Sequence, residues 1–334
     1  MTGRRMAAAI AIIAAAALTP VVHAYLKIGS DVNGKSVSVR WARMPIKYFV
    51  TNRDVPGVTA LQLQTAAQRG LDTWAKTPAV TISSQFGGFV SAEAGDNDGA
   101  NVIGFRARPD LDKVLGATSF QIDSVTGELL ESDIFLNSSF DWSVAVGGET
   151  GRFDVQSIAT HELGHFLGLG HSGLGETEIR PTGGRRVIAK QATMFPIAFP
   201  AGNIDDRTPK PDDLAGLADT YSSAAFNRDY GQASGRVTLN GRGVFGAHVT
   251  AFNSKTGELI AAFSLDTQGT FVIGGLKPGL YLLRAEPLDD ADINSFFSGT
   301  VTVDLNFVPT YATVLVAVPA GGSSKAVEIK VLSK

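Results

Sequence analysis

Residues 161–172 read His-Glu-Leu-Gly-His-Phe-Leu-Gly-Leu-Gly-His-Ser and decide how the rest of the chain is interpreted. His161 and His165 are four residues apart, so on an α-helix they share one face about one turn apart. Two imidazoles placed in this way can bind the same metal ion. Glu162 directly follows the first of them, where a carboxylate can act as a base on metal-activated water without being a ligand. The spacing therefore predicts a helix that carries two metal ligands and a general base.

A glycine and a third histidine extend this pattern. Gly168 comes three residues after His165, and glycine adopts positive φ, so the helix can end there and the chain can turn back. That turn would bring His171 to the same ion. Three protein ligands with a fourth position open for water are typical of a catalytic zinc site. The alternative is a buried apolar helix with incidental histidines.

The stretch H161-E-L-G-H165-F-L-G168-L-G-H171-S172 resembles the zinc-binding motif of the metzincin peptidases. Within them it is most similar to the matrixins, the matrix-metalloproteinase family, whose third histidine is typically followed by serine. The resemblance implies one catalytic zinc ion held by His161, His165 and His171, with Glu162 as the general base. It also implies an exported endopeptidase with a protein or peptide substrate.

A methionine motif follows the histidines. Met194-Phe195-Pro196 resembles the Met-turn that lies beneath the zinc ligands of metzincins, with phenylalanine where matrixins often have tyrosine. By the same resemblance, Pro196, Ile197 and Ala198 would form a wall of the pocket for the substrate side chain beyond the scissile bond. Matrixins commonly carry tyrosine where Ala198 falls, so the depth of that pocket stays open.

The helix expected after Pro209 begins with an acidic pair. Asp212 and Asp213 lie in its first turn, where carboxylates face the positive end of the helix dipole. In matrixins a pair at this position steadies the Met-turn or receives a chain terminus. The pair also reads as simple helix caps, and the two interpretations are compatible.

Upstream of the histidines, strand and helix patterns alternate. Leu63, Ala67, Leu71 and Trp74 recur at helical spacing within residues 58–76. This order predicts an α+β domain over residues 25–222, and the matrixin resemblance implies a metzincin-like catalytic domain with a twisted, mostly parallel sheet and three helices. A hairpin turn is expected at residues 33–34, strands at 45–50, 80–84, 101–105, 116–121 and 132–136, and a second helix at 152–168.

One of these strands is expected to hold the substrate. Residues 115–120 resemble the matrixin edge strand that pairs with an extended peptide. An exposed edge offers unpaired N–H and C=O groups to such a peptide. We therefore expect Gly116 and Ala117 to contact the substrate.

An acidic run between the strands suggests a second cation. Asp96 and Asp98 alternate with other residues before Gly99, as calcium ligands often do. The same run is common in plain polar turns, so calcium and a turn both remain open. Glu131 and Asp133 lie in a region where matrixins hold structural calcium, and the same two interpretations apply to them.

The chain changes character after residue 222. Residues 223–232 are small and polar and are expected to form a linker. Short β runs between glycine turns then predict an all-β sandwich over residues 233–334, with His248 on a strand. Its sequence, including S234-G-R-V-T-L-N and D266-T-Q-G-T-F, resembles the carboxypeptidase-regulatory-like domain, a transthyretin-like sandwich that is generally non-catalytic.

For this sandwich, adhesion, spacing and docking of a substrate or a surface all remain open. The sandwich also keeps a second hypothesis open, in which the protein is a secreted binding or adhesion protein. In that case the sandwich would be the functional part, and the zinc site would be structural or vestigial.

The first 24 residues are typical of a secretion signal. Arg4 and Arg5 precede an apolar stretch that is short for a membrane span, and Val22-His23-Ala24 suits cleavage. The alternative is an uncleaved anchor. We expect a secreted, extracellular protein, with the periplasm or the cell surface as alternatives, and no membrane span after signal removal. The formal net charge of −3 gives no reason to expect nucleic acid as a partner.

The numbers of histidines and cysteines limit which metal sites the chain can form. The chain has five histidines, and His23 and His248 lie far from the motif, so none is left for the second, structural zinc of animal matrixins. Cysteine is absent, which excludes disulfides, thiolate ligands and the cysteine switch of that family. We therefore expect a single zinc ion.

Overall fold

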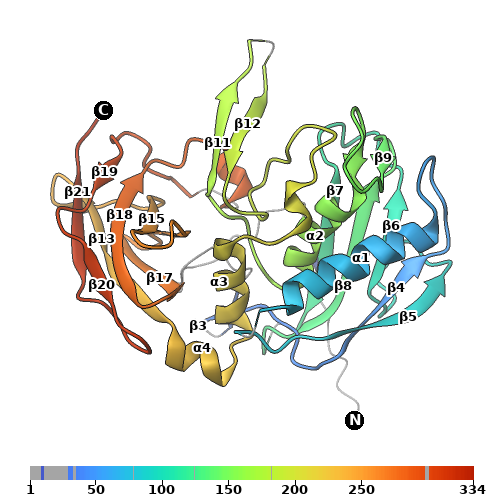
Figure 1. Ribbon diagram of the computed structural model, residues 1–334, viewed down its shortest axis with the longest axis horizontal. Helices are drawn as coiled ribbons and strands as arrows, with labels where there is room; N and C mark the ends of the chain where they lie inside the picture. The colour runs from blue at the N-terminus through green and yellow to red at the C-terminus, as the bar shows by residue number, and fades with distance from the viewer. Residues whose placement is uncertain are drawn as a thin grey trace.

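The computed structural model describes residues 9–10, 29–32, 35–77, 79–123, 125–181, 183–297 and 301–334. The N-terminal part, meaning the described residues before 231, contains one large mixed sheet with helices against it. The C-terminal β region, residues 231–334, is built on two further sheets (Figure 1).

The sheet of the N-terminal part has the strand order β1-β7-β8-β6-β4-β5. Strand β4 is parallel to both β5 and β6, and β6 is parallel to β8. Strand β7 is antiparallel to β8. The two-residue strand β1 pairs with β7 at Phe120 and Gln121. The strands are β1 (Ala9–Ile10), β4 (Ile46–Thr51), β5 (Ser84–Val90), β6 (Val102–Arg106), β7 (Gly116–Ile122) and β8 (Leu129–Asn137).

Helices α1 (Ala60–Ala75) and α2 (Val155–Phe166) pack together and share one apolar core with strands β4, β6 and β8. The predicted apolar face of α1 is buried, and its Trp74 donates an indole hydrogen bond of 2.9 Å to the carbonyl of Thr160 on α2. Asp154 caps α2 by accepting from the backbone N–H of Ser157 at 2.8 Å. This capped, buried helix carries the first two histidines.

Smaller elements complete the N-terminal part. Helix α3 (Pro211–Thr220) starts as predicted, with both aspartates in its first turn. The other strands are β2 (Gly29–Val32), β3 (Lys35–Ser38), β9 (Trp142–Ser143) and β10 (Phe153–Asp154), and a 3₁₀ turn, η1, spans Asp205–Arg207. The turn expected at residues 33–34 and the predicted signal, residues 1–24, lie outside the described residues, apart from Ala9–Ile10 in β1.

Three expectations from the sequence differ from the structure, and the third, the segment after His171, is described in the next paragraph. The strand expected at 80–84 begins only at Ser84, because Val80 makes a single isolated bridge to Ser222. The residues expected to be a linker contain helix α4 (Ala224–Asp229), whose Phe226 is buried against Ala218 of α3 and Ala79, which follows α1. Burial of that one aromatic ring makes the segment a packed connection.

The glycine-rich, partly basic composition of the segment after His171 predicts a flexible, exposed loop, whereas the structure forms an antiparallel hairpin there. Strands β11 (Gly175–Ile179) and β12 (Arg185–Lys190) build it, and it projects between the two halves of the molecule (Figure 1). Its inner end is anchored by Lys190, whose ammonium forms a buried ion pair of 2.6 Å with Asp206.

The C-terminal β region has a core between two sheets, and Ala215 of α3 packs into that core. One sheet has the order β14-β13-β17 with β21 beside β13, and the other has the order β16-β15-β18-β19 with β20 beside β18. The strands are β13 (Gly231–Leu239), β14 (Arg242–Gly243), β15 (His248–Asn253), β16 (Leu259–Phe263), β17 (Thr270–Leu276), β18 (Gly279–Glu286), β19 (Thr310–Tyr311), β20 (Val316–Val318) and β21 (Val327–Val331), with a 3₁₀ turn, η2, at Ile293–Ser295.

The two parts are packed tightly against each other. An interface cluster joins Val187 and Phe195 of the N-terminal part to apolar residues of the C-terminal β region: Phe263, Leu265, Leu288, Ala291, Phe296 and Phe297. A polar contact lies beside the interface cluster: Thr177 on the hairpin donates its N–H to the carboxylate of Asp290 at 2.8 Å. A groove of about 360 Å³ opens beside this interface, between the hairpin and the sheet that carries His248.

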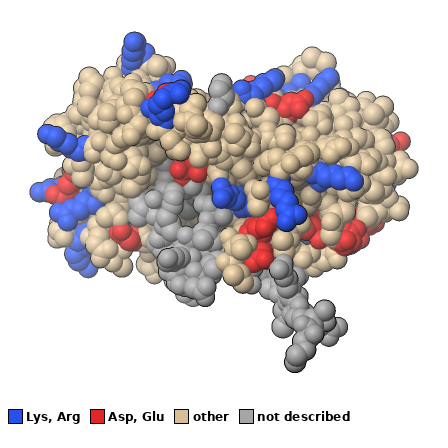
Figure 2. Space-filling model, turned by 90° about the horizontal axis from the view of Figure 1, so that it is seen from below, with Lys and Arg blue, Asp and Glu red and all other residues tan. Residues whose placement is uncertain are grey.

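The surface carries mixed charge. Seen from below, Lys and Arg side chains are interspersed with Asp and Glu over the described residues, and no broad patch of one sign covers that face (Figure 2). Among the described helices, none is both long enough and apolar enough to cross a membrane.

Candidate metal centre

The structure brings the three predicted ligands together at the C-terminal end of α2. His161 and His165 share a face of the helix, and His171 returns to them after the turn. The three offer ligand nitrogens that all lie within 4.8 Å of one another, and the Nε2 atoms of His165 and His171 are 3.2 Å apart. In the described part of the chain, this is the one group of at least three such side chains close enough to hold an ion together.

The turn depends on a glycine, as expected. Gly168 has a φ of +90°, and a Cβ on it would lie 2.1 Å from the carbonyl oxygen of Val39. Both the dihedral angle and the close approach of the backbone exclude a side chain there. The sequence predicted the dihedral angle, and the tertiary structure adds the close approach of the Val39 backbone, just after β3, as a second reason.

Each histidine has its Nδ1 atom bonded to a backbone carbonyl. The carbonyl partners are Thr193 for His161 at 2.7 Å and Leu169 for His165 at 2.8 Å. His171 uses the carbonyl of Ser295 at 2.6 Å. Because a carbonyl only accepts hydrogen bonds, each Nδ1 carries the proton and each Nε2 keeps its lone pair.

These three rings fit a zinc ion. Burial lowers the pKa of His165 to about 4 and that of His171 to about 3, and it lowers the pKa of His161 well below its usual value, so all three are neutral near pH 7. Two lone pairs at 3.2 Å repel each other unless a cation lies between them. Neutral imidazoles that converge through Nε2 are the ligands that zinc prefers.

Glu162 is buried beside this cluster and is 5% exposed. The Thr118 hydroxyl donates to its Oε2 at 2.7 Å, and a Cβ on Gly116 would lie only 3.1 Å from its Oε1. Burial raises the pKa of Glu162 to about 7, and the hydrogen bond from Thr118 partly opposes that rise. A carboxyl group in this state can take up and release a proton near neutral pH.

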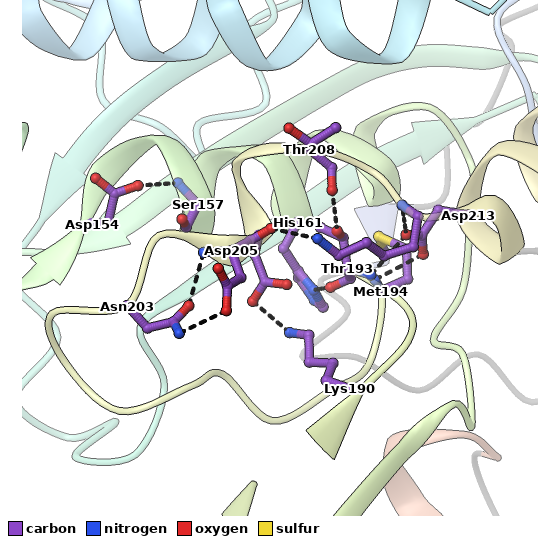
Figure 3. A network of polar contacts seen from close by, with 12 residues as sticks. Asp154, Ser157, His161, Lys190, Thr193, Met194, Asn203, Asp205, Thr208 and Asp213 are labelled. Atoms are coloured by element: carbon purple, nitrogen blue, oxygen red, sulfur yellow. Dashed lines mark hydrogen bonds and ion pairs between the residues drawn. The ribbon is translucent and has the colours of Figure 1, made fainter. Parts of the chain in front are cut away.

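The segment around Met194 is fixed from α3. Asp213 accepts the N–H groups of Thr193 at 2.7 Å and of Met194 at 3.0 Å, and it also accepts that of Lys210 (Figure 3). The Thr193 carbonyl in turn holds His161. The sulfur of Met194 lies directly beneath α2, because a Cβ on Gly164 would come within 2.2 Å of it. Asp213 therefore steadies this turn, while Asp212 has other partners, described below.

The residues expected to touch a substrate lie in two segments, the start of β7 and the residues after the Met194 turn. Gly116 and Ala117 begin β7, and in the described part of the chain their only strand partner is β8. Pro196, Ile197 and Ala198 follow the Met194 turn and are partly exposed. Ile197 packs against the interface cluster and Ala198 against the core beneath the helices.

The loop expected to bind calcium is tied down by hydrogen bonds. Asp133 accepts the N–H groups of Gly95 at 2.6 Å and of Val102 at 2.7 Å, and Glu131 accepts that of Gly99 at 2.8 Å. Asp96 and Asp98 lie on the exposed side of the loop, and Asp98 accepts the N–H of Ala100. Calcium at this position stays a prediction.

Sequence reasoning missed two residues of the site. Thr118 lies two residues after Gly116 on a strand, so the alternation of side chains would have placed both on the face of β7 that meets Glu162. Ser295 had no detectable signal, because a backbone carbonyl leaves no trace in the side-chain pattern.

Comparison with known proteins agrees with this geometry. Residues 40–182, which include all three histidines and Glu162, match the family model described as Matrixin. The chain is 26% identical to Metalloendoproteinase 2-MMP of Arabidopsis thaliana over 200 residues, which cover 53% of this chain and 48% of the relative. Metalloendoproteinase 1-MMP of the same plant is also 26% identical, over 57% of this chain and 45% of its own length.

The chain thus spans about half the length of the curated relatives it matches. The match covers strands β4 to β8 of the sheet, helices α1 and α2, and the three histidines, and it ends before Met194. Together, the family match and these relatives support a matrixin-type zinc metallopeptidase domain over residues 40–182.

Proposed function

We propose that the protein is an exported zinc-dependent endopeptidase that hydrolyses peptide bonds in proteins or peptides. The observation that carries the proposal is the convergence of three neutral histidines next to a buried glutamate. A site that only stabilises the fold has no need of Glu162, and the glutamate is kept reactive by burial and by one hydrogen bond from Thr118.

When bound, zinc would supply Lewis acidity that activates water and polarises a carbonyl group. His161, His165 and His171 would hold it through Nε2. Glu162 would take the proton from the attacking water and pass it to the leaving amine, for which a pKa near neutrality is well suited. Gly116 and Ala117 would align the substrate as an added strand, and Pro196, Ile197 and Ala198 would bound the pocket beyond the scissile bond.

We further propose export, based on the signal-like residues 1–24. We also propose that the C-terminal β region is a sandwich of the carboxypeptidase-regulatory type. The groove between the hairpin and its sheet supports a docking role for that region.

The competing proposal, a binding protein with a vestigial metal site, is favoured only by that groove. It gives no reason for the Thr118 hydrogen bond to Glu162 or for the glycine that makes room for this carboxylate.

Glu162→Gln tests the peptidase proposal. Glutamine keeps the shape of the side chain but cannot accept the proton, so we expect the rate of peptide cleavage to fall by about 10²–10⁴-fold while zinc content stays at one ion per chain. The readout is digestion of a peptide library by the purified protein, together with metal analysis. Glu149→Gln, which changes a half-exposed carboxylate that pairs with Arg152 outside the metal cluster, should cleave like the parent. Equal rates for the parent and Glu162→Gln would refute the assignment.

A further inference from the structure

His171 differs from the other two histidines in where its hydrogen-bond partner comes from. The carbonyls that hold His161 and His165 belong to residues of the N-terminal part. The carbonyl that holds His171 belongs to Ser295, which is 124 residues further along the chain in the C-terminal β region. At 2.6 Å it is also the shortest of the three contacts.

The next residue is tied to the same region by a second route. The Ser172 hydroxyl donates to Oδ2 of Asp212 at 2.6 Å, and Oδ1 of Asp212 accepts the backbone N–H of Ala261 on β16 at 2.8 Å. All three residues are buried. The dipeptide His171-Ser172 is therefore held by two backbone groups of the C-terminal β region, one directly and one through Asp212.

The carbonyl of Ser295 is itself held in place. The N–H of Ser295 donates to the backbone carbonyl of Asp292 at 2.8 Å, and the N–H of Phe296 donates to that of Ile293 at 2.9 Å. These two hydrogen bonds close the η2 turn. The ring of Phe296 is 6% exposed and anchors the turn in the interface cluster, with its centroid 5.7 Å from that of Phe263. The same ring meets His171 edge-on at 6.4 Å.

We propose that the C-terminal β region is a positioning element of the metal centre. The Ser295 carbonyl keeps the proton of His171 on Nδ1, so that Nε2 presents its lone pair to the ion. The η2 turn fixes the plane of the ring. Ser295 and Phe296 are positioning residues, because they act through His171. The inference rests on the proposed function only in taking zinc as the ion, and it does not require peptide cleavage.

The test compares two phenylalanine truncations in the full-length protein. Phe296→Ala removes the ring that anchors the η2 turn. Phe271→Ala removes a ring of the same size that is 1% exposed in the separate core of the C-terminal β region. The dissociation constant for zinc is measured by competition with a chromophoric chelator. We expect Phe296→Ala to weaken zinc binding by about 10–100-fold, the usual effect of losing a partner behind a ligand, and Phe271→Ala to leave it unchanged within about twofold.

A spectroscopic readout reports the tautomer directly. In the zinc-loaded parent labelled with ¹⁵N-histidine, long-range correlation spectra should show His171 protonated at Nδ1, with a ring proton protected from exchange. In Phe296→Ala that protection should be lost, while the signals of His161 and His165 stay as they are. If either alanine variant fails to fold, Phe296→Leu and Phe271→Leu provide the same comparison with less lost volume.

Two results would overturn the inference. One is unchanged zinc affinity in Phe296→Ala although the protection of the His171 ring proton is lost. The other is equal weakening in both variants, which would mean that zinc binding follows only the general stability of the C-terminal β region. Neither measurement involves a substrate, so a failed peptidase assay with a supported zinc result would remove the proposed function alone.

Discussion

At the scale of single residues, burial shifts the pKa values of the site, and single hydrogen bonds shift them in the opposite direction. Burial raises the pKa of Glu162, and the hydroxyl of Thr118 lowers it again by stabilising the carboxylate. Burial lowers the pKa of all three histidines, which keeps them neutral and able to bind a metal near pH 7. The same physical cause thus prepares the histidines as ligands and the glutamate as a base.

Thr118→Val should shift the pH dependence of cleavage. The base must be ionised to act, so kcat/KM rises with pH through the pKa of Glu162. Without the hydroxyl that pKa is higher, and the acid limb of the profile should move to higher pH. One hydrogen bond to a charged group is worth about 1.4 kcal/mol, or about one unit of pKa, so at pH 7 we expect kcat/KM to fall by about fivefold.

The matched control for this change is Thr118→Ser, which keeps the hydroxyl and should keep the parent's profile. The profiles are recorded with a fluorogenic peptide at saturating zinc. A shift of the acid limb toward lower pH in Thr118→Val would show that the hydrogen bond acts on Glu162 in the opposite sense.

At the scale of elements, the site lies where α2 ends and the chain turns back. The cap at Asp154 starts the helix, Gly168 ends it, and Asp213 at the start of α3 fixes the Met194 turn beneath it. The Met194 turn therefore links α2 to the start of α3, and the Thr193 carbonyl in this turn also holds His161. A change at either end of α2 should therefore be felt at the histidines.

Gly168→Ala should destabilise the fold and weaken zinc binding. A side chain at a φ of +90° is strained, and its Cβ would meet the Val39 carbonyl at 2.1 Å, so the turn must move and carry His171 with it. We expect the free energy of unfolding to fall by more than the roughly 1–2 kcal/mol that a left-handed residue costs alone.

Gly184→Ala separates backbone strain from the clash in this prediction. Gly184 has a φ of +80° in the hairpin, and a Cβ there would meet nothing within 4 Å. Denaturant unfolding of both variants gives the comparison. An equal loss of stability at the two positions would mean that contact with Val39 contributes nothing.

At the scale of the whole molecule, the N-terminal part and the C-terminal β region share a buried interface. The interface cluster buries aromatic rings from the C-terminal β region against the hairpin and Phe195. The ties at Ser295 and Asp212 add buried hydrogen bonds to this contact. An apolar interface with satisfied polar groups favours cooperative unfolding over independent domains.

The protein should therefore unfold in a single step. Its three tryptophans, Trp41, Trp74 and Trp142, all lie in the N-terminal part, so their fluorescence reports on that part alone. We expect the fluorescence midpoint to coincide with the calorimetric peak, and both to fall together when a chelator removes zinc, since an ion that binds only the folded state stabilises it.

Phe263→Ala should break this coincidence, because it removes a central ring of the interface cluster. Phe271 lies in the core of the C-terminal β region. Phe271→Ala should therefore lower the midpoint of unfolding without splitting the unfolding transition into two. Two resolved transitions in the parent would show that the interface does not couple the parts.

The sequence by itself determined the local features of this protein. The four-residue spacing of His161 and His165, the glycine at 168 and the aspartates at the start of α3 follow from helical period, permitted dihedral angles and helix-end charge. These rules act over a few residues, so they can be read along the chain. The apolar spacing in α1 and the alternation in β7 are set in the same way.

Only the tertiary structure decided which distant groups complete the site. The Ser295 carbonyl, the Thr118 hydroxyl and the N–H of Ala261 reach their partners because packed sheets and an interface cluster bring them there. The hairpin at residues 175–190 was missed for a related reason, since two short strands with glycines between them are stabilised by contact with the C-terminal β region and not by local preference. Long-range packing depends on the whole chain at once, and no local pattern in the sequence encodes it.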